Sequence, residues 1–330
     1  MSDVRTLQPT KAQDLWLTVL RWFDSWAGLE YMKTDGVPKM DWLRCIPIIA
    51  VHAMCLGVIW VGTSWTAVAV AVAFYFLRMF AITGWYHRYF SHRTFKTSRT
   101  VQFLFAVLGG SCAQRGPLWW AGHHRHHHIA SDTPDDVHSP RGGFLWSHIG
   151  WFTSQTHFAP RLKGIADFAK YPELRFLDRF DILVPTIAGF AMFGFGKLLE
   201  IYAPQLGTNG PQMLIWGFFI STVALIHGTC TINSLSHVYG SQRYDTGDDS
   251  RNNFLLALIT MGEGWHNNHH FYPASTCQGF YWWEIDMTYY CLKVMEWLGL
   301  VWDVRDVPVY VREQKRKEET IGVPLTALES

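Results

Sequence analysis

Two long stretches of the chain are poor in charged residues and predict membrane-spanning helices. The first lies between Arg44 and Arg78, where no Asp, Glu, Lys or Arg occurs. About 20 apolar residues cross a bilayer, so this interval is long enough for two helices. Gly62-Thr63-Ser64 stands near its middle and indicates a turn. We therefore expect spans at 45–62 and 65–86, joined by a short external loop.

The second stretch runs from 182 to 242 and contains only Lys197 and Glu200 as charged residues. Its centre, 203–211, is rich in Gly, Pro and Asn, which predicts a loop between spans at 182–201 and 212–233. The alternative is a set of buried helices in a soluble protein. Charge-free runs of this length favour the bilayer.

The distribution of basic residues predicts the orientation of these spans. Both expected external loops lack Lys and Arg, so the remaining segments and both termini are expected in the cytoplasm. Leu15, Trp16, Val19, Leu20 and Phe23 form an apolar stripe at helical spacing. This stripe predicts an interfacial helix, with packing onto the cytoplasmic domain as the alternative. The expected organisation is a cytoplasmic arm (1–44), a first transmembrane hairpin (45–86), a cytoplasmic segment (87–181), a second transmembrane hairpin (182–233) and a cytoplasmic segment with the tail (234–330).

The fold class predicted from this pattern is an all-α integral membrane protein with four transmembrane helices and a helical cytoplasmic domain. Composition agrees, because charged residues make up 17% of the chain against about 25% in soluble proteins. A net charge of +1 argues against a nucleic-acid partner. The six cysteines show no CxxC pair, which argues against a zinc ribbon.

Three clusters of histidines stand on the expected cytoplasmic side. They are His87 with His92, His123 to His128, and His266 to His270. HxxHH places its histidines at i, i+3 and i+4, which is one face of a helix. Imidazole suits Fe, Zn, Cu and Ni, so ligand type alone leaves the metal open. A closed structural zinc needs four ligands, so eight or more histidines without cysteine predict two metal ions with open positions.

Four segments carry a resemblance to a known family. They are HRYFSHRTFKTS (87–98), HRHHHIASDTPDDVHSPRGGFLWSHIGW (124–151), INSLSHVYG (232–240) and GEGWHNNHHFYP (262–273). Over about residues 45–305 the chain resembles the stearoyl-CoA (delta-9) acyl desaturases. The resemblance implies four spans and a di-iron centre of two Fe ions, which uses O2 and two electrons to introduce a cis double bond into a fatty acyl chain. The metal would carry this chemistry, because no side chain alone removes hydrogen from an unactivated methylene.

The resemblance also implies a set of metal ligands. His123, His126 and His127 fit HxxHH too, but the segment that follows matches without a gap only in the register of His124, His127 and His128. Asn233 matches an asparagine that reaches one metal through water. The implied ligands are His87, His92, His124, His127, His128, His237, His266, His269 and His270. Carboxylates that could accept the other N–H of these rings are Asp132, Asp135, Asp136, Asp245, Asp248, Asp249 and Glu263.

The acyl carrier and the redox partner follow less directly from the sequence. Acyl-CoA is the expected carrier, with acyl carrier protein or a lipid as alternatives, because Gly122 and His123 replace an Arg-Asp pair of the animal acyl-CoA enzymes. All three carriers bring phosphate, so we expect a basic mouth, with candidates at Arg88, Arg93, Arg115, Arg141 and Arg161. The electron donor is expected to be a separate protein of the cytochrome b5, ferredoxin or rubredoxin type. A bacterial inner membrane is favoured, with the endoplasmic reticulum as the alternative.

The resemblance further implies a narrow apolar tunnel for a C16 or C18 chain. Trp120 matches an aromatic residue beside its bend, and Tyr75 and Ala71 match positions that set its depth. The bulk of Tyr75 predicts a preference for palmitoyl over stearoyl chains.

Two other functions are alternatives to a desaturase. The nearest is a histidine-rich di-iron membrane hydroxylase or ketolase acting on a lipid. A metal-ion transporter would need ionisable ligands within the spans, where only His52 and His227 stand, and each is expected to be a lone packed residue.

Overall fold

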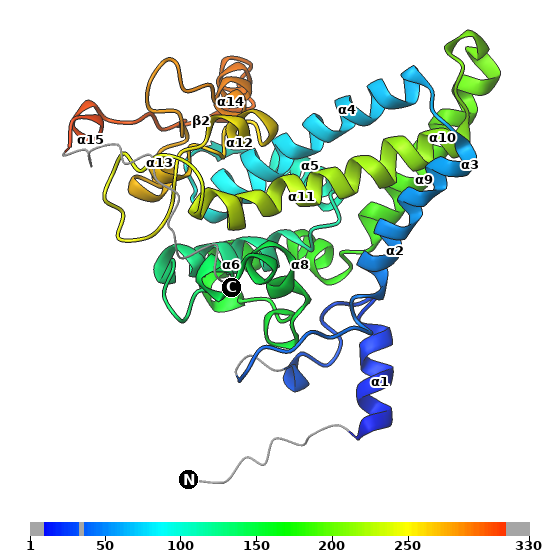
Figure 1. The fold of residues 1–330 in the computed structure, drawn as a ribbon, viewed down its shortest axis with the longest axis horizontal. Helices are drawn as coiled ribbons and strands as arrows, with labels where there is room; N and C mark the ends of the chain where they lie inside the picture. Colours follow the sequence, from blue (N-terminus) through cyan, green and yellow to red (C-terminus); the bar gives the residue numbers. More distant parts are fainter. Residues whose placement is uncertain (1–9, 33–35, 315–330) are drawn as a thin grey trace.

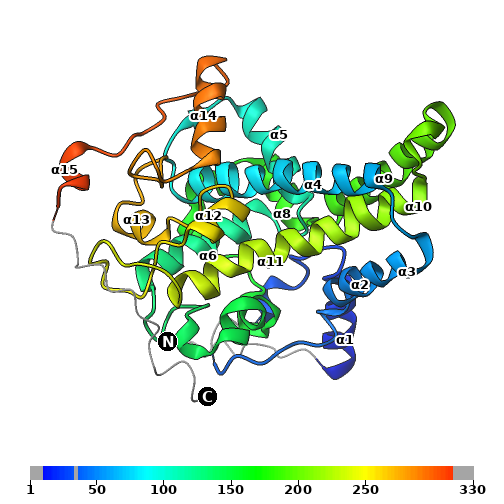
Figure 2. The same cartoon turned by 45° about the horizontal axis from the view of Figure 1, so that its top comes forward.

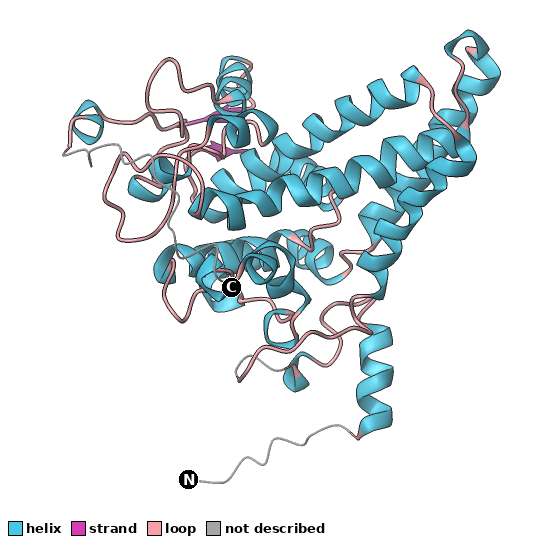
Figure 3. Cartoon of the chain, in the orientation of Figure 1, coloured by secondary structure: helices cyan, strands magenta, loops and turns pink. Residues whose placement is uncertain are grey.

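The computed structural model describes residues 10–32 and 36–314 and is mostly helical (Figures 1 and 3). Three of its helices are long and apolar enough to cross a membrane, and they overlap three of the predicted spans. The first joins α4 (Trp65–Phe80) to η3 (Ala81–Ser91), and the second is α9 (Leu183–Tyr202). The third runs through α10 (Gly210–Gln212), η10 (Met213–Ile220), α11 (Ser221–Ser234) and η11 (Leu235–His237).

The fourth predicted span, 45–62, is an apolar helix of lesser length, Ile46–Val61. It consists of α2 (Ile46–Met54), η2 (Cys55–Gly57) and α3 (Val58–Val61). A helix of this length reaches about 24 Å, short of the roughly 30 Å hydrocarbon core. Three candidate spans are therefore established, and the fourth stays a prediction.

Local sequence explains where the spanning helices begin. The Ser64 side chain accepts a hydrogen bond from the backbone N–H of Ala67, which caps α4. Gly62 ends the preceding helix at a φ of 67°, a conformation that glycine adopts without strain. The Asn209 side chain caps α10 in the same way, after the short turn η9 (Pro204–Leu206). Both predicted interhelical turns are thus confirmed.

The predicted N-terminal helix forms as α1 (Lys11–Leu20), drawn at the lower right of Figure 1. Leu15, Trp16 and Phe23 of its apolar stripe are exposed rather than packed on the rest of the chain. An interfacial role for this helix stays a prediction. The predicted arm and tail also include residues 1–9, 33–35 and 315–330, which lie outside the described residues.

The histidine-bearing ends of the long helices meet a layer of shorter elements. Figures 1 and 2 show α4 and α11 side by side, with α6 (Pro117–Ala130) and α13 (His266–Phe271) at the same end. All of η3 is buried, and Trp85 stacks on Phe105 of α5 (Arg99–Gly110) with ring centroids 3.5 Å apart. Strands β1 (Lys96–Thr97) and β2 (Val301–Trp302) pair antiparallel. The remaining elements are η1 (Leu29–Tyr31), η4 (Pro140–Gly142), η5 (Trp146–Gly150), η6 (Trp151–Thr153), η7 (Gln155–His157), η8 (Leu162–Ile165), α7 (Ala166–Ala169), α8 (Pro172–Arg179), α12 (Phe254–Ile259), α14 (Met287–Trp297) and α15 (Val309–Arg312).

Candidate metal centre

Nine histidines converge in two groups at this end of the fold. In each group, one ring nitrogen per residue lies within 4.8 Å of the others. The nine are the same residues that the resemblance implies as ligands. The first group is His87, His92, His124, His128 and His269, and the second is His127, His237, His266 and His270.

Each HxxHH sequence contributes to both groups. On α6, His124 and His128 stand four residues apart and reach the first group, whereas His127 points to the second. On α13 the relation is reversed, because only His269 of its three histidines joins the first group. Residues i, i+3 and i+4 share one broad face of a helix, but i+3 stands about 100° around the axis from i+4, so it can reach a different group. Each of the two helices therefore supplies ligands to both groups and fixes their relative position.

Within the groups, imidazole edges face one another at short distances. The Nε2 atoms of His87 and His269 are 3.0 Å apart, and those of His269 and His128 also 3.0 Å. Nε2 of His237 lies 3.0 Å from Nε2 of His266. A neutral imidazole has one N–H and one lone pair, so a ring that faces two others cannot satisfy all three by hydrogen bonds. A metal ion between the rings would satisfy them together.

Buried carboxylates hold the outer nitrogens of four of these rings. Asp136 lies 3.0 Å from Nδ1 of His127, and Asp132 lies 2.8 Å from Nδ1 of His237. Asp248 accepts from Nδ1 of His270 at 2.6 Å, and Glu263 contacts Nδ1 of His87. An N–H donated to a carboxylate fixes the tautomer and leaves Nε2 as a lone pair directed at the metal. Four of the seven candidate carboxylates thus orient implied ligands.

The charge state of the site suits a cation. Burial alone raises the pKa of the Asp132, Asp136 and Asp248 carboxyls. The hydrogen bond from the paired histidine, together with nearby histidine charge and further hydrogen bonds, more than offsets it, so each pKa lies below its ordinary value. Burial lowers the pKa of His270 to about 4, although Asp248 opposes the shift. Burial also lowers the pKa of the ring of His128. Neutral rings beside ionised carboxylates are the form in which histidine binds metal.

Two ring nitrogens without hydrogen-bond partners indicate that the residues fit metal ions. Nε2 of His127 and Nε2 of His270 are buried and have no hydrogen-bond partner, although the Nδ1 atoms of the same rings are paired. Buried polar atoms without a partner are rare and costly. In the second group these atoms are the ones that a metal ion would bind. The residues therefore fit the two metal ions that the sequence predicts.

Asn233 lies beside the two groups, four residues before His237. With His87, His124, His127 and His266 it lines a small cavity of about 40 Å³. Its role through a water molecule stays a prediction.

The histidines outside the implied ligand set have other partners. His123 packs at a tilt against Trp119, and its Nε2 lies 3.2 Å from the carbonyl oxygen of Ala159. Nε2 of His126 lies 3.0 Å from the carbonyl oxygen of Asp135. Neither joins a metal group, which agrees with the register preferred from the sequence. His138 is buried beside Asp136 and with His127 forms a third, smaller group of potential ligands.

The prediction that His52 and His227 are lone packed residues is wrong. Their Nε2 atoms are 3.2 Å apart, and Nδ1 of His227 lies 3.0 Å from Nε2 of His148. His148 in turn reaches the hydroxyl of Ser234 at 2.9 Å. The three rings come from segments far apart in the chain, so no spacing in the sequence indicates this connection.

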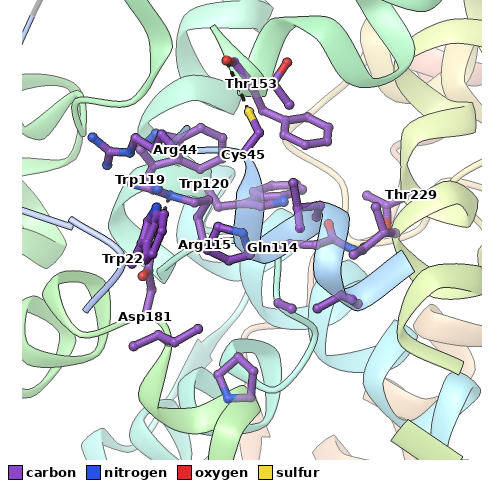
Figure 4. A pocket seen from close by; sticks show the side chains of 18 of the residues that line it. Trp22, Arg44, Cys45, Gln114, Arg115, Trp119, Trp120, Thr153, Asp181 and Thr229 are labelled. Atoms are coloured by element: carbon purple, nitrogen blue, oxygen red, sulfur yellow. Dashed lines mark hydrogen bonds and ion pairs between the residues drawn. The ribbon is translucent and has the colours of Figure 1, made fainter. Parts of the chain in front are cut away.

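A second, larger cavity of about 710 Å³ leads away from the metal groups (Figure 4). Trp120 lines both cavities, as expected of a residue at the bend of a tunnel. Tyr75 and Ala71 line neither: the Tyr75 hydroxyl donates to the carbonyl oxygen of Ile259 at 2.8 Å, and Ala71 is buried. Met79 lines the small cavity instead, so a tunnel floor at Tyr75 stays a prediction.

The arginines predicted at the mouth have different surroundings. Arg88 is buried, with ion pairs to Glu263 and Asp286, so its placement at a basic mouth is wrong. Arg115 lines the large cavity, as do Arg44 and Arg21, which the sequence reasoning missed. Outside the cavity, Arg93 pairs with Asp167, Arg141 pairs with Asp249, and Arg161 lies against His123.

Apolar spanning helices that carry buried histidine groups define a membrane protein with a histidine-rich metal site. The family model for fatty acid desaturases matches residues 63–302. The chain therefore belongs to the fatty acid desaturase family and is a desaturase-family enzyme.

Relatives of known function extend over most of the chain. It is 35% identical over 294 residues to an acyl-CoA 5-desaturase of Anemone leveillei, covering 85% of this chain and 87% of the relative. It is 34% identical to an sn-1 stearoyl-lipid 9-desaturase of Anabaena variabilis, covering 82% and 96%. It is also 34% identical to the delta-9 acyl-lipid desaturase 1 of Arabidopsis thaliana, covering 81% and 84%.

Proposed function

We propose that this enzyme introduces a cis double bond at the delta-9 position of a saturated C16 or C18 acyl chain, with O2 and an external electron donor. The single observation that carries the proposal is the convergence of nine histidines, in two groups, beside a small cavity and a large apolar one that share Trp120, His124 and Asn233. A 5-desaturase stands among the relatives, but delta-9 enzymes on lipid substrates recur there, which supports the position.

In this proposal the nine histidines hold two iron ions, and Asn233 contributes through water. Bound iron would supply, with O2, the oxidising power that no side chain has. The protein orients the ligands, since Asp132, Asp136, Asp248 and Glu263 fix the rings through their outer N–H groups. Imidazole ligands add no negative charge at the metals.

The acyl chain would pass Trp120 and bring its middle to the histidine groups. Trp120 stacks on His124, with ring centroids 5.1 Å apart. Beyond the groups, Met79, Ile82 and Thr83 line the small cavity, where the methyl end of the chain would enter. Tyr75, one turn further along α4, and then Ala71 would limit the depth. Burial of the reacting methylene away from water protects the chemistry.

The proposed arrangement in the membrane has four spans, with the metal groups and both termini in the cytoplasm. The absence of Lys and Arg from 62–65 and from 203–211 supports this orientation. Electrons would come from a separate protein of the cytochrome b5, ferredoxin or rubredoxin type. A bacterial inner membrane is the proposed location.

The test is expression in cells followed by mapping of double bonds in their fatty acids. We expect new delta-9 monounsaturated C16 or C18 chains with the native protein and none with His128→Ala. Hydroxylated chains in place of alkenes would identify a hydroxylase and contradict the proposal.

A further inference from the structure

The large cavity continues well beyond the path that a single acyl chain needs. Its metal end is marked by His124 and Asn233. From there it follows η10–α11 as far as Leu214, about 28 Å along that helix at the usual rise per residue. The acyl path proposed above leaves this arm unused, because it runs from Trp120 to the small cavity at Met79.

The walls of the arm are apolar and come from three helices. Ile48 and Val51 of α2 form one side, and Phe190 and Phe193 of α9 form the other. Phe218 belongs to η10, the wall between them. Since Phe190 lines the cavity and is also 74% exposed, the arm opens at this helix. That surface faces the bilayer in a membrane protein, so the opening admits apolar chains from the side.

Near the start of α2, the cavity is also lined by a basic cluster formed by Arg21, Arg44 and Arg115 (Figure 4 labels Arg44 and Arg115). Asp181 also lines the cavity and pairs with Arg115 at 3.2 Å. Arg21 is held by the carbonyl oxygens of Ala27 and Gly28. The cluster thus has three guanidinium groups and one carboxylate lining the same cavity.

Among the described residues, Arg44 and Arg21 both lack an ion pair, but Arg44 also has few hydrogen-bond partners. It is only 7% exposed, its Nε has no hydrogen-bond partner, and its NH2 group reaches only the Ser25 carbonyl oxygen at 3.5 Å. Its guanidinium lies over the ring of Phe158, 4.1 Å from the centroid. Burial lowers the pKa of Arg44 well below its ordinary value, and Arg115 and Arg21 lower it further, against weaker opposition from Asp181 and Asp41. A buried cation in this state is stabilised by an anion that binds in the cavity.

We infer that the cavity binds a two-chain glycerophospholipid that enters from the bilayer, with its phosphate at Arg44, one acyl chain at the metal groups and the other in the arm along α9 and η10. This inference rests on the proposed function and names the acyl carrier. Arg44 stands two residues before α2, at the predicted cytoplasmic border of the first span, where lipid phosphates would lie. The guanidinium fork matches phosphate geometry. An acyl-CoA has one acyl chain and a large polar carrier, so it would leave the apolar arm empty.

The test is a binding measurement that does not require turnover. The full-length protein in detergent micelles is titrated with phosphatidylglycerol carrying dibrominated acyl chains, which quench nearby tryptophan fluorescence. Trp22, Trp119 and Trp120 line the cavity and report on occupancy. Dibrominated acyl-CoA, acyl carrier protein and a neutral diacyl galactolipid are titrated in parallel.

We expect phosphatidylglycerol to bind at least roughly tenfold more tightly than acyl-CoA or acyl carrier protein. Arg44→Gln should weaken its binding by about tenfold or more, since a charge-assisted contact is lost. The matched control is Arg99→Gln, because Arg99 is an exposed arginine paired with Glu173 outside the cavity. Equal loss in both variants, tighter binding of acyl-CoA, or equal binding of the galactolipid would each overturn the phosphate assignment.

A second pair of variants tests the lateral arm. Thr186 lines the cavity and is exposed, whereas Ile187, the next residue, is exposed and outside it. Thr186→Trp should weaken binding of the two-chain lipid by roughly tenfold, as a large side chain narrows the opening, and should spare the lyso form with one chain. Ile187→Trp should leave both unchanged. Equal weakening of both lipids by Thr186→Trp would overturn the assignment of the second acyl chain to the arm. If the lipid binds as expected but the cells form no alkene, the desaturase proposal fails and the lipid site stands.

Discussion

Replacing Asp136 by Asn should loosen the second metal group without removing any ligand. The Asp136 side chain is fully buried, and its two oxygens accept from Nδ1 of His127 and from the backbone N–H groups of Asp132 and His138. Asn has the same shape but only one acceptor oxygen, so its NH2 group must face one of these donors. It also removes the negative charge that lies beside the ring of His127.

Asp136→Asn should lower both the metal affinity of the second group and the folding stability of the protein. Loss of a carboxylate that orients a metal-bound histidine weakens metal affinity by about 10- to 100-fold, or about 1.4–2.8 kcal/mol. A buried donor left without an acceptor costs a further 1–3 kcal/mol or so of folding stability. We therefore expect Asp136→Asn to lose metal from the second group and to unfold at a lower temperature.

The assay is the metal content of the purified enzyme after dialysis against a graded series of chelator concentrations. The control is Asp135→Asn, since Asp135 is adjacent in sequence but exposed. We expect the Asp136 variant to release metal at a chelator concentration about 10- to 100-fold lower than that needed for the control. Identical release curves would refute the argument that buried carboxylates tune this site.

Three further predictions follow from particular contacts. His127→Ala should abolish desaturation and His126→Ala should be mild, because only His127 faces a metal group; equal loss of product in both variants would contradict the register. Tyr75→Ala should shift products from C16 toward C18, because it removes a discrimination between the two chain lengths of roughly tenfold or more. Tyr75→Phe should leave the product ratio unchanged. An unchanged ratio in the alanine variant would show that Tyr75 is not the tunnel floor. Arg88→Gln leaves two buried carboxylates without their cation, at a cost of about 3–5 kcal/mol, so the unfolding temperature should fall, and an unchanged value would show that the network is not stabilising.

Sequence reasoning predicted the membrane helices well where length and charge decide the outcome. Charge-poor stretches predicted α4, α9 and α11, and Gly62 with Ser64 marked the turn before α4. The first apolar helix is shorter than predicted because Gly62, at positive φ, ends it after Ile46–Val61. Length and hydropathy indicate an apolar helix but do not by themselves fix where it ends.

The histidine groups were predictable as a set but not in their arrangement. Spacing alone indicated that each HxxHH presents its histidines on one face of a helix, but not that His127 and His269 each join the group opposite to their neighbours. Which side a residue serves depends on how α6 and α13 pack, and this is a tertiary property. The same reason hid the link between His52 and His227, whose ring nitrogens meet only after two helices pack together.

The buried arginine could not be found from the pattern either. Arg44 stands just before an apolar stretch, where a basic residue ordinarily marks the cytoplasmic border of a span. Its burial depends on Phe158 and Ser25, which come from elsewhere in the chain. Only the folded arrangement distinguishes a border arginine from one that lines a cavity.

The most direct test of the central claim is the iron content of the purified, reconstituted enzyme, measured by mass spectrometry beside its His237→Ala and His128→Ala variants. Two groups of histidines predict two irons per chain, with each variant losing iron from its own group and losing desaturation entirely. A single iron per chain in the active native enzyme, or two irons retained in both variants, would contradict the account.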